Sequence, residues 1–345
     1  MIDSSGNDRV IASWLLICAF LIFAMVILGG VTRLTGSGLS MVKWHPIHGV
    51  IPPMSAQEWE EEFAHYQESP EFQKINRDMT VDGFKQIFYF EYAHRMLGRF
   101  IGLVFLLPFL FFYFRRKIKP GLTPKLVIMF ILGGMQGLLG WYMVKSGLVD
   151  NPHVSQYRLT AHLMAAILIY GFILWTSLTL LNPQPRIPKA ASSVPGFRRA
   201  IHWLMLLLVV TIISGGFVAG LKAGLIFNTF PTMDGQWIPD GILALSPWYL
   251  NLFENLVTVQ FDHRLLALTT GTLVLVYWAL ASFQNFDRIT KISFHLLAVM
   301  VLVQIGLGIT TLLAQVPVWL GATHQAGALM LFSLALFNMH RLSRC

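Results

Sequence analysis

Four histidines stand inside long apolar runs of the sequence: His94, His162, His263 and His324. An ionisable side chain in such a run is costly to bury and usually marks a function. Two imidazoles at the same depth on facing helices can supply both axial ligands of a haem iron. A metal outside a porphyrin would need a third or fourth N, O or S ligand nearby, and the apolar surroundings offer few. The sequence therefore predicts two bis-histidine haem sites, one in each half of the chain.

Arginines accompany these histidines. Arg95 directly follows His94, and Arg264 directly follows His263. Arg99 lies one helical turn beyond Arg95, and Arg158 lies one turn before His162. A guanidinium group can bind a carboxylate in a bidentate manner, so these side chains are candidates to hold haem propionates. The alternative is that each is an ordinary interfacial arginine whose charge reaches water.

One acidic residue distinguishes the two halves. Glu91 lies three residues before His94, so helical spacing puts both on one face. Gln260 occupies the corresponding place before His263, and an amide does not titrate. This difference predicts proton-coupled chemistry in the first half and electron transfer alone in the second. A role for Glu91 in capping the start of its helix is the alternative.

The composition indicates a membrane protein. Only 12% of the 345 residues are charged and 55% are hydrophobic, whereas a soluble domain has about 25% charged residues. Eight apolar runs are long enough to cross a bilayer as helices, because backbone groups cannot stay unpaired in lipid. The predicted spans are Val10–Gly30, Tyr92–Phe114, Leu126–Val144, Leu159–Leu181, Ala200–Ala219, Phe261–Phe283, Ile292–Ala314 and Trp319–Met339.

Matched motifs in the two halves indicate a tandem repeat. The first span of each half ends in a glycine pair, Gly29–Gly30 and Gly215–Gly216. The third span of each half contains Gln-x-x-x-Gly, at Gln136–Gly140 and Gln304–Gly308. Both halves contain four spans and start on the same side, so the repeat axis should run along the membrane normal. We expect an all-α polytopic membrane protein made of two tandem, pseudo-symmetric four-helix bundles, residues 1–185 and 186–345.

The loop charges predict the orientation. Basic residues gather in the short loops around Arg115–Lys125, Arg186–Arg199 and Arg288–Lys291 and at the chain ends, so both termini should be cytoplasmic. The four histidines then lie near the outer face. The net charge of +8 belongs to this loop pattern and does not indicate nucleic-acid binding. The sequence lacks Cys-x-x-Cys-His, so any haem is held without a covalent bond.

These residues resemble the haem A synthase family, membrane enzymes that oxidise a methyl group of haem O to the formyl group of haem A. The similarity covers nearly the whole chain and includes no cysteine pair in the first outer loop, as in the family's cysteine-free branch. The motifs that carry it are GGVTRLTGSGLS at 29–40, EYAHRMLGR at 91–99, QGLLGWYMVKSGL at 136–148, RLTAHL at 158–163, GGFVAGLKAG at 215–224, FNTFP at 227–231, FDHRLLA at 261–267 and THQ at 323–325.

The resemblance implies a role for each site. His263 and His324 match the axial ligands of a bound haem b in the C-terminal half. His94 and His162 match the histidines of the half that processes the substrate haem O. Glu91 matches the carboxylate associated with that substrate site.

We therefore expect an oxidoreductase, a haem A synthase of a bacterial inner membrane. It would oxidise a ring methyl of haem O by two successive hydroxylations, through hydroxymethyl haem, to supply haem A for cytochrome c oxidase. Haem O synthase and oxidase assembly factors are candidate partners, the electron acceptor is unknown, and glycine-rich segments allow a homo-oligomer. Two alternatives stay open, a di-haem b-type electron-transfer cytochrome of the membrane and a non-catalytic haem chaperone.

Overall fold

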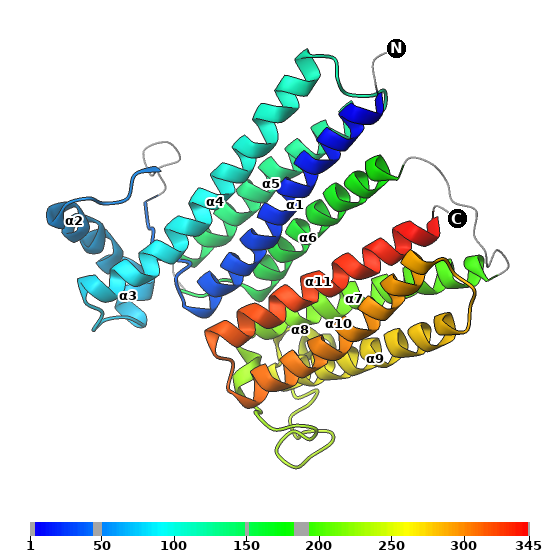
Figure 1. Cartoon of the computed structure of the whole chain (residues 1–345). Coiled ribbons are helices and arrows are strands. Elements are labelled where there is room, and N and C mark those ends of the chain that lie inside the picture. The colour runs from blue at the N-terminus through cyan, green and yellow to red at the C-terminus, as the bar shows by residue number, and fades with distance from the viewer. Residues whose placement is uncertain (1–3, 44–49, 149–151, 183–192, 344–345) are drawn as a thin grey trace. The chain divides into compact units, whose positions relative to one another are not determined.

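The computed structural model describes residues 4–43, 50–148, 152–182 and 193–343 (Figure 1). These residues form eleven α-helices and no β-strand. Eight helices are long and apolar enough to span a membrane, which confirms the predicted fold class. They are α1 (Ser4–Leu34), α4 (Val81–Phe114), α5 (Thr123–Gly147), α6 (Gln156–Leu181), α7 (Val194–Leu221), α9 (Leu256–Ser282), α10 (Arg288–Leu313) and α11 (Val318–Ser343). The shorter helices are α2 (Ala56–Gln67), α3 (Pro70–Lys74) and α8 (Asn251–Glu254).

The chain forms two compact units. One is Phe20–Ala166, and the other comprises the described residues of Met1–Ala19 and Ile167–Cys345. Each histidine pair lies wholly within one unit. The predicted boundary between the sequence repeats, at residue 185, falls outside the described residues and stays a prediction.

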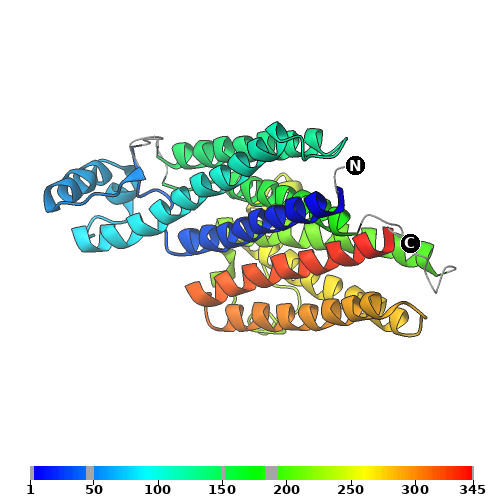
Figure 2. The same cartoon turned by 45° about the horizontal axis from the view of Figure 1, so that its top comes forward.

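In the second unit four helices close a ring. Helix α7 packs against α9, α9 against α10, α10 against α11, and α11 against α7. Figures 1 and 2 both show α10 and α11, in orange and red, side by side. Helices α9 and α11 therefore stand at opposite corners of the ring, as expected for alternate helices of a bundle. This arrangement lets side chains of α9 and α11 face each other across the interior.

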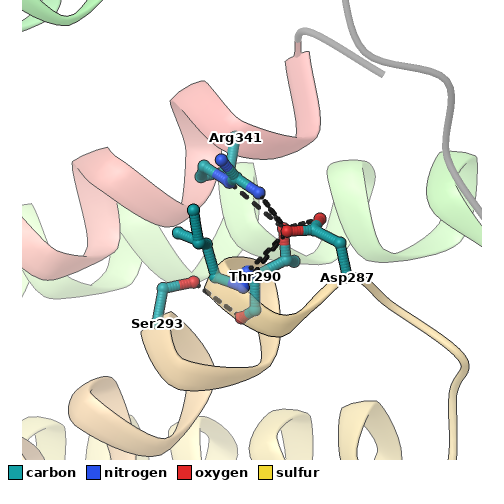
Figure 3. Close-up of polar contacts among 5 residues, drawn as sticks. Asp287, Thr290, Ser293 and Arg341 are labelled. Atoms are coloured by element: carbon teal, nitrogen blue, oxygen red, sulfur yellow. Dashed lines mark hydrogen bonds and ion pairs between the residues drawn. The ribbon is translucent and has the colours of Figure 1, made fainter.

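A polar network joins α10 and α11 at the end of the bundle remote from His324 (Figure 3). Asp287 caps α10 by accepting from the backbone N–H of Ile289 and Thr290, at 3.2 and 3.3 Å. The buried guanidinium of Arg341 pairs with the Asp287 carboxylate and donates to Thr290 Oγ1 at 2.9 Å. Ser293 Oγ donates to the Thr290 carbonyl at 2.8 Å. The network fixes the end of α11 to the first turn of α10.

Replacing Arg341 by methionine should lower the stability of the protein. The Arg341 side chain is only 3% exposed, whereas that of Asp287 is 44% exposed, so water compensates part of the lost ion pair. We expect a loss of about 1–3 kcal/mol, measured as a lower midpoint of thermal unfolding in detergent by circular dichroism. Arg288→Met removes the same charge from an exposed position of α10 and is the matched control. Equal midpoints for the two variants would contradict a structural role for the Arg341 network.

Helix α4 begins earlier than the hydropathy pattern predicts. It starts at Val81 and is capped by Thr80, whose Oγ1 accepts from the backbone N–H of Gly83. The predicted start at Tyr92 was wrong because aromatic side chains continue the helix beyond the apolar run. Phe84 and Phe88 pack with an aromatic cluster on α2 that includes Trp59, Phe63 and Tyr66. Figure 1 shows this outer lobe, with α2 and α3 beside the start of α4.

This lobe contains the helices α2 and α3. Its Glu58, Glu60 and Glu61 are exposed on α2. Tyr66 lies in the interior of the lobe, where Asn76 Nδ2 donates to its hydroxyl at 2.7 Å. Burial raises the pKa of Tyr66 above its ordinary value, so its hydroxyl stays protonated and can donate to Glu71.

Candidate functional site

The first histidine pair lies in the unit Phe20–Ala166. His94 is on α4 and His162 is near the start of α6. His94 rests against Gly29 of α1, where an added Cβ atom would lie 3.2 Å from Nε2. His162 rests against Gly140 of α5, where a Cβ atom would lie 2.9 Å from Cε1. Only glycine allows the two imidazoles to approach these helix backbones so closely.

The second pair has the same arrangement in the other unit. His263 is on α9 and His324 is near the start of α11. A Cβ atom on Gly215 of α7 would lie 3.2 Å from His263 Cε1, and one on Gly308 of α10 would lie 2.9 Å from His324 Cε1. In both units a histidine of an even-numbered span is therefore backed by a glycine of an odd-numbered span.

Contacts of the glutamine and the glycine explain why Gln-x-x-x-Gly occurs in both halves of the chain. Gln136 Nε2 donates to the backbone carbonyl of His162 at 2.8 Å. Gln304 Nε2 donates to the carbonyl of His324 at 3.0 Å. The glutamine fixes the backbone that bears the second histidine, and the glycine one turn later makes room for its ring. The sequence repeat is thus a repeat of one histidine-holding device.

The residues present fit a haem better than a bare metal ion. No group of three or more His, Cys, Asp or Glu side chains could hold a metal within the part of the chain that the structure describes. A porphyrin supplies four nitrogens and needs only two axial ligands from the protein. All four imidazoles are half-buried within membrane-spanning helices. His162 Nδ1 is a buried atom for which the structure shows no hydrogen-bond partner.

Glu91 connects the first site to the outer loop. Its buried carboxylate accepts from Ser40 Oγ at 2.7 Å and from the backbone N–H of Met41 at 2.8 Å. Arg95, one turn along α4, pairs with the same carboxylate and donates to the Met41 carbonyl at 3.1 Å. Because α4 starts at Val81, Glu91 is well inside the helix, and the alternative that it caps the helix is wrong. Glu91 and Arg95 hold the loop against the helix turn that bears the first histidine.

The second half also holds its loop, but there the side chain at the position of Glu91 donates to a loop carbonyl instead of accepting from loop donors. Gln260 Nε2 donates to the Phe227 carbonyl at 3.0 Å, and Arg264 Nη2 donates to the same carbonyl at 2.9 Å. Arg264 also donates to the Thr229 carbonyl at 2.8 Å. Glu91 and Gln260 therefore both contact a loop, Glu91 as an acceptor and Gln260 as a donor. Arg95 and Arg264 act here on loop backbone, and a role for them toward haem propionates stays a prediction.

The other predicted arginines lie in the first unit. The Arg158 guanidinium is 4.7 Å from the ring centre of Tyr142, a cation–π contact. Arg99 lies one turn beyond Arg95, with Nη1 at 3.5 Å from Met96 Sδ. Sequence reasoning missed Arg33, which follows Gly29 by one turn of α1 and so faces the same way as the glycine behind His94. Its position four residues after the glycine was the signal that could have found it.

Together these features define a class: a polytopic helical membrane protein with one glycine-backed histidine pair in each of two units. The model of the COX15-CtaA family, described as cytochrome oxidase assembly protein, matches residues 12–336, and the chain belongs to this family.

Named relatives align over almost the whole chain. It is 51% identical over 337 residues to the "Heme A synthase" of Nitrosospira multiformis, which covers 98% of this chain and 94% of the relative. It is 47% identical over 349 residues to the "Heme A synthase COX15" of Homo sapiens, covering 99% of this chain and 85% of the relative. The resemblance noted from the motifs is confirmed.

Proposed function

We propose that the protein is a haem A synthase. It oxidises a ring methyl of haem O by two successive hydroxylations, the first giving hydroxymethyl haem and the second a gem-diol that loses water to form the formyl group of haem A. The observation that carries the proposal is the duplicated histidine–glycine device with a carboxylate in only one copy. Relatives named for this activity at 45–51% identity support it.

The second unit is proposed to hold a resident haem b. His263 and His324, from opposite corners of the helix ring, would hold its iron. Haem b, when bound there, supplies reversible one-electron chemistry. Gly215 and Gly308 let the imidazoles stand back against their neighbouring helices, and the loop held by Gln260 covers the outer end. No titratable group occupies the Gln260 position, which suits a relay that moves electrons only.

The first unit is proposed to bind the substrate, haem O. His94 and His162 orient the substrate, and apolar helix surface accommodates its farnesyl tail. Glu91 is the proton acceptor beside the site, because it is the one acidic group that the matched position of the second unit lacks. Ser40, Met41 and Arg95 fix its carboxylate one turn from His94. Arg99 and Arg158 are the candidates to bind the substrate's propionates.

The setting follows from the loop charges. We place both termini in the cytoplasm of a bacterial cell, the chain in the inner membrane, and the haem sites near its outer face. His162, His263 and His324 lie near the starts of α6, α9 and α11, which is the side opposite the basic loops. The partners we propose are haem O synthase, oxidase assembly factors and an electron acceptor of unknown identity.

The test is a turnover experiment with the purified full chain in lipid nanodiscs. The protein is incubated with haem O and a reconstituted electron-transfer system, and the extracted pigments are separated and weighed by mass spectrometry. The proposal expects hydroxymethyl and formyl products. Absence of both, under conditions in which the human relative forms them, would reject it and leave an electron-transfer cytochrome or a haem chaperone.

Adding one methyl group behind the second ligand should weaken the resident haem. In Gly308→Ala the new Cβ atom would meet His324 Cε1 at 2.9 Å, and displacing the ring should cost about 1–3 kcal/mol. We expect the affinity for haem b to fall at least about tenfold, measured as haem absorbance per protein after washing with apo-myoglobin. Gly306→Ala is the matched control, because nothing lies within 4 Å of its added Cβ atom. Equal retention in the two variants would show that the close approach is not needed.

A further inference from the structure

The hydroxyl group of Ser214 lies beside the His263 ring and determines which ring nitrogen carries the proton. Ser214 precedes Gly215 on α7, and its Oγ lies 2.8 Å from His263 Nδ1. The same Oγ lies 2.7 Å from the carbonyl oxygen of Thr211, and a carbonyl can only accept. The single hydroxyl proton of Ser214 therefore points at Thr211.

The direction of the second hydrogen bond follows from the first. Because its proton is used on Thr211, Ser214 Oγ can only accept from His263. Nδ1 of His263 must then carry the ring proton, which leaves Nε2 with the free lone pair that a metal requires.

The matched positions of the first unit differ. Aligning the glycine pairs places Leu28 opposite Ser214, and a leucine side chain offers no acceptor to an imidazole N–H. In the same unit His162 Nδ1 is buried without a hydrogen-bond partner. The ring orientations differ as well, because a Cβ atom on Gly29 would meet Nε2 of His94, whereas one on Gly215 would meet Cε1 of His263. The two units thus repeat the contacts between glycine and histidine but differ in the residue beside the first ring.

We propose that Ser214 is a positioning residue that makes the second site a permanent haem site, whereas Leu28 leaves the first site able to exchange its haem. This rests on the proposed function, in which one haem stays bound and the other is taken up and released. A hydrogen bond to the remote nitrogen of a metal-bound imidazole fixes its tautomer and raises its basicity, and losing such a partner typically weakens metal binding about 10–100-fold. A more basic ligand favours the ferric form, so the same contact lowers the midpoint potential of the resident haem.

The test compares haem b in the full chain and in Ser214→Ala by redox titration and by retention against apo-myoglobin. We expect retention to fall about tenfold, and the midpoint potential to rise by about 59 mV for each tenfold loss confined to the ferric form. Ser214→Thr keeps the hydroxyl and should behave as the unchanged protein does. Thr270→Val is the matched control, because it removes the 2.8 Å hydroxyl contact between α9 and α7 without touching the imidazole.

The reciprocal variant gives an independent test. Leu28→Ser places a hydroxyl next to Gly29, against which the His94 ring rests, so haem O or its products should leave the first unit about tenfold more slowly, measured by their transfer to apo-myoglobin. Unchanged potential and retention in Ser214→Ala, or unchanged release in Leu28→Ser, would overturn the positioning role while leaving the synthase assignment intact. A full chain without a bis-histidine haem b signal would instead overturn the assignment of the second site.

Discussion

Replacing His324 by alanine is expected to abolish the low-spin haem b signal of the purified protein. His263 alone cannot provide both axial ligands, and among the described residues no third histidine lies with this pair. The reduced α-band and the low-spin electron paramagnetic resonance signal should therefore both disappear, with haem content falling at least tenfold. Synthesis of haem A should stop as well, since the electron relay is lost.

His162→Ala is the matched control, because it removes the equivalent ligand from the first unit. This variant should keep the low-spin haem b signal at full intensity and lose only the conversion of haem O. A haem b signal that survives in His324→Ala and vanishes in His162→Ala would reverse the assignment of the two sites.

Replacing Glu91 by glutamine is expected to reduce haem A synthesis by about 10²–10⁴-fold, the usual contribution of a positioned acid–base group. Gln260 shows that a glutamine at this position, with an arginine one turn later, still holds the outer loop. The variant should therefore fold and keep its haem b spectrum. The measurement is the rate of hydroxymethyl and formyl haem formation, with the haem b absorbance as an internal standard.

Ser40→Ala separates the two roles of Glu91. It removes one donor to the carboxylate, at 2.7 Å, but leaves the carboxylate itself in place. A loss of only a few-fold is expected, as for one hydrogen bond of about 1 kcal/mol. If Glu91→Gln and Ser40→Ala form hydroxymethyl and formyl haem at the same rate, the carboxylate only anchors the loop, and its role as proton acceptor is refuted.

The sequence was sufficient for features that a local pattern of residues determines. The eight spans follow from apolar length, and the histidine pairing follows from matched motifs in the two halves. The glycines were recognised as part of the repeat, but their contact with the imidazoles was not. A spacing pattern does not say which glycine lies behind which ring, because that depends on how the helices are rotated in the bundle.

The rest needed three-dimensional contacts between distant segments. The Glu91 carboxylate meets Ser40 and Met41, about fifty residues earlier in an outer loop without periodicity. The extension of α4 back to Val81 depends on Phe84 and Phe88 packing on α2, whereas a hydropathy window records only where the apolar run ends. Arg95 and Arg264 could have faced propionates or loop carbonyls, and only the folded loops distinguish these.

The most direct test of two unlike haem sites is to weigh the porphyrins bound to the protein purified from membranes that make haem O. We expect retained haem B together with a second, farnesylated haem carrying a methyl, hydroxymethyl or formyl group, and we expect His94→Ala to remove only the second. Finding only haem B, both in the unchanged protein and in His94→Ala, would contradict the account.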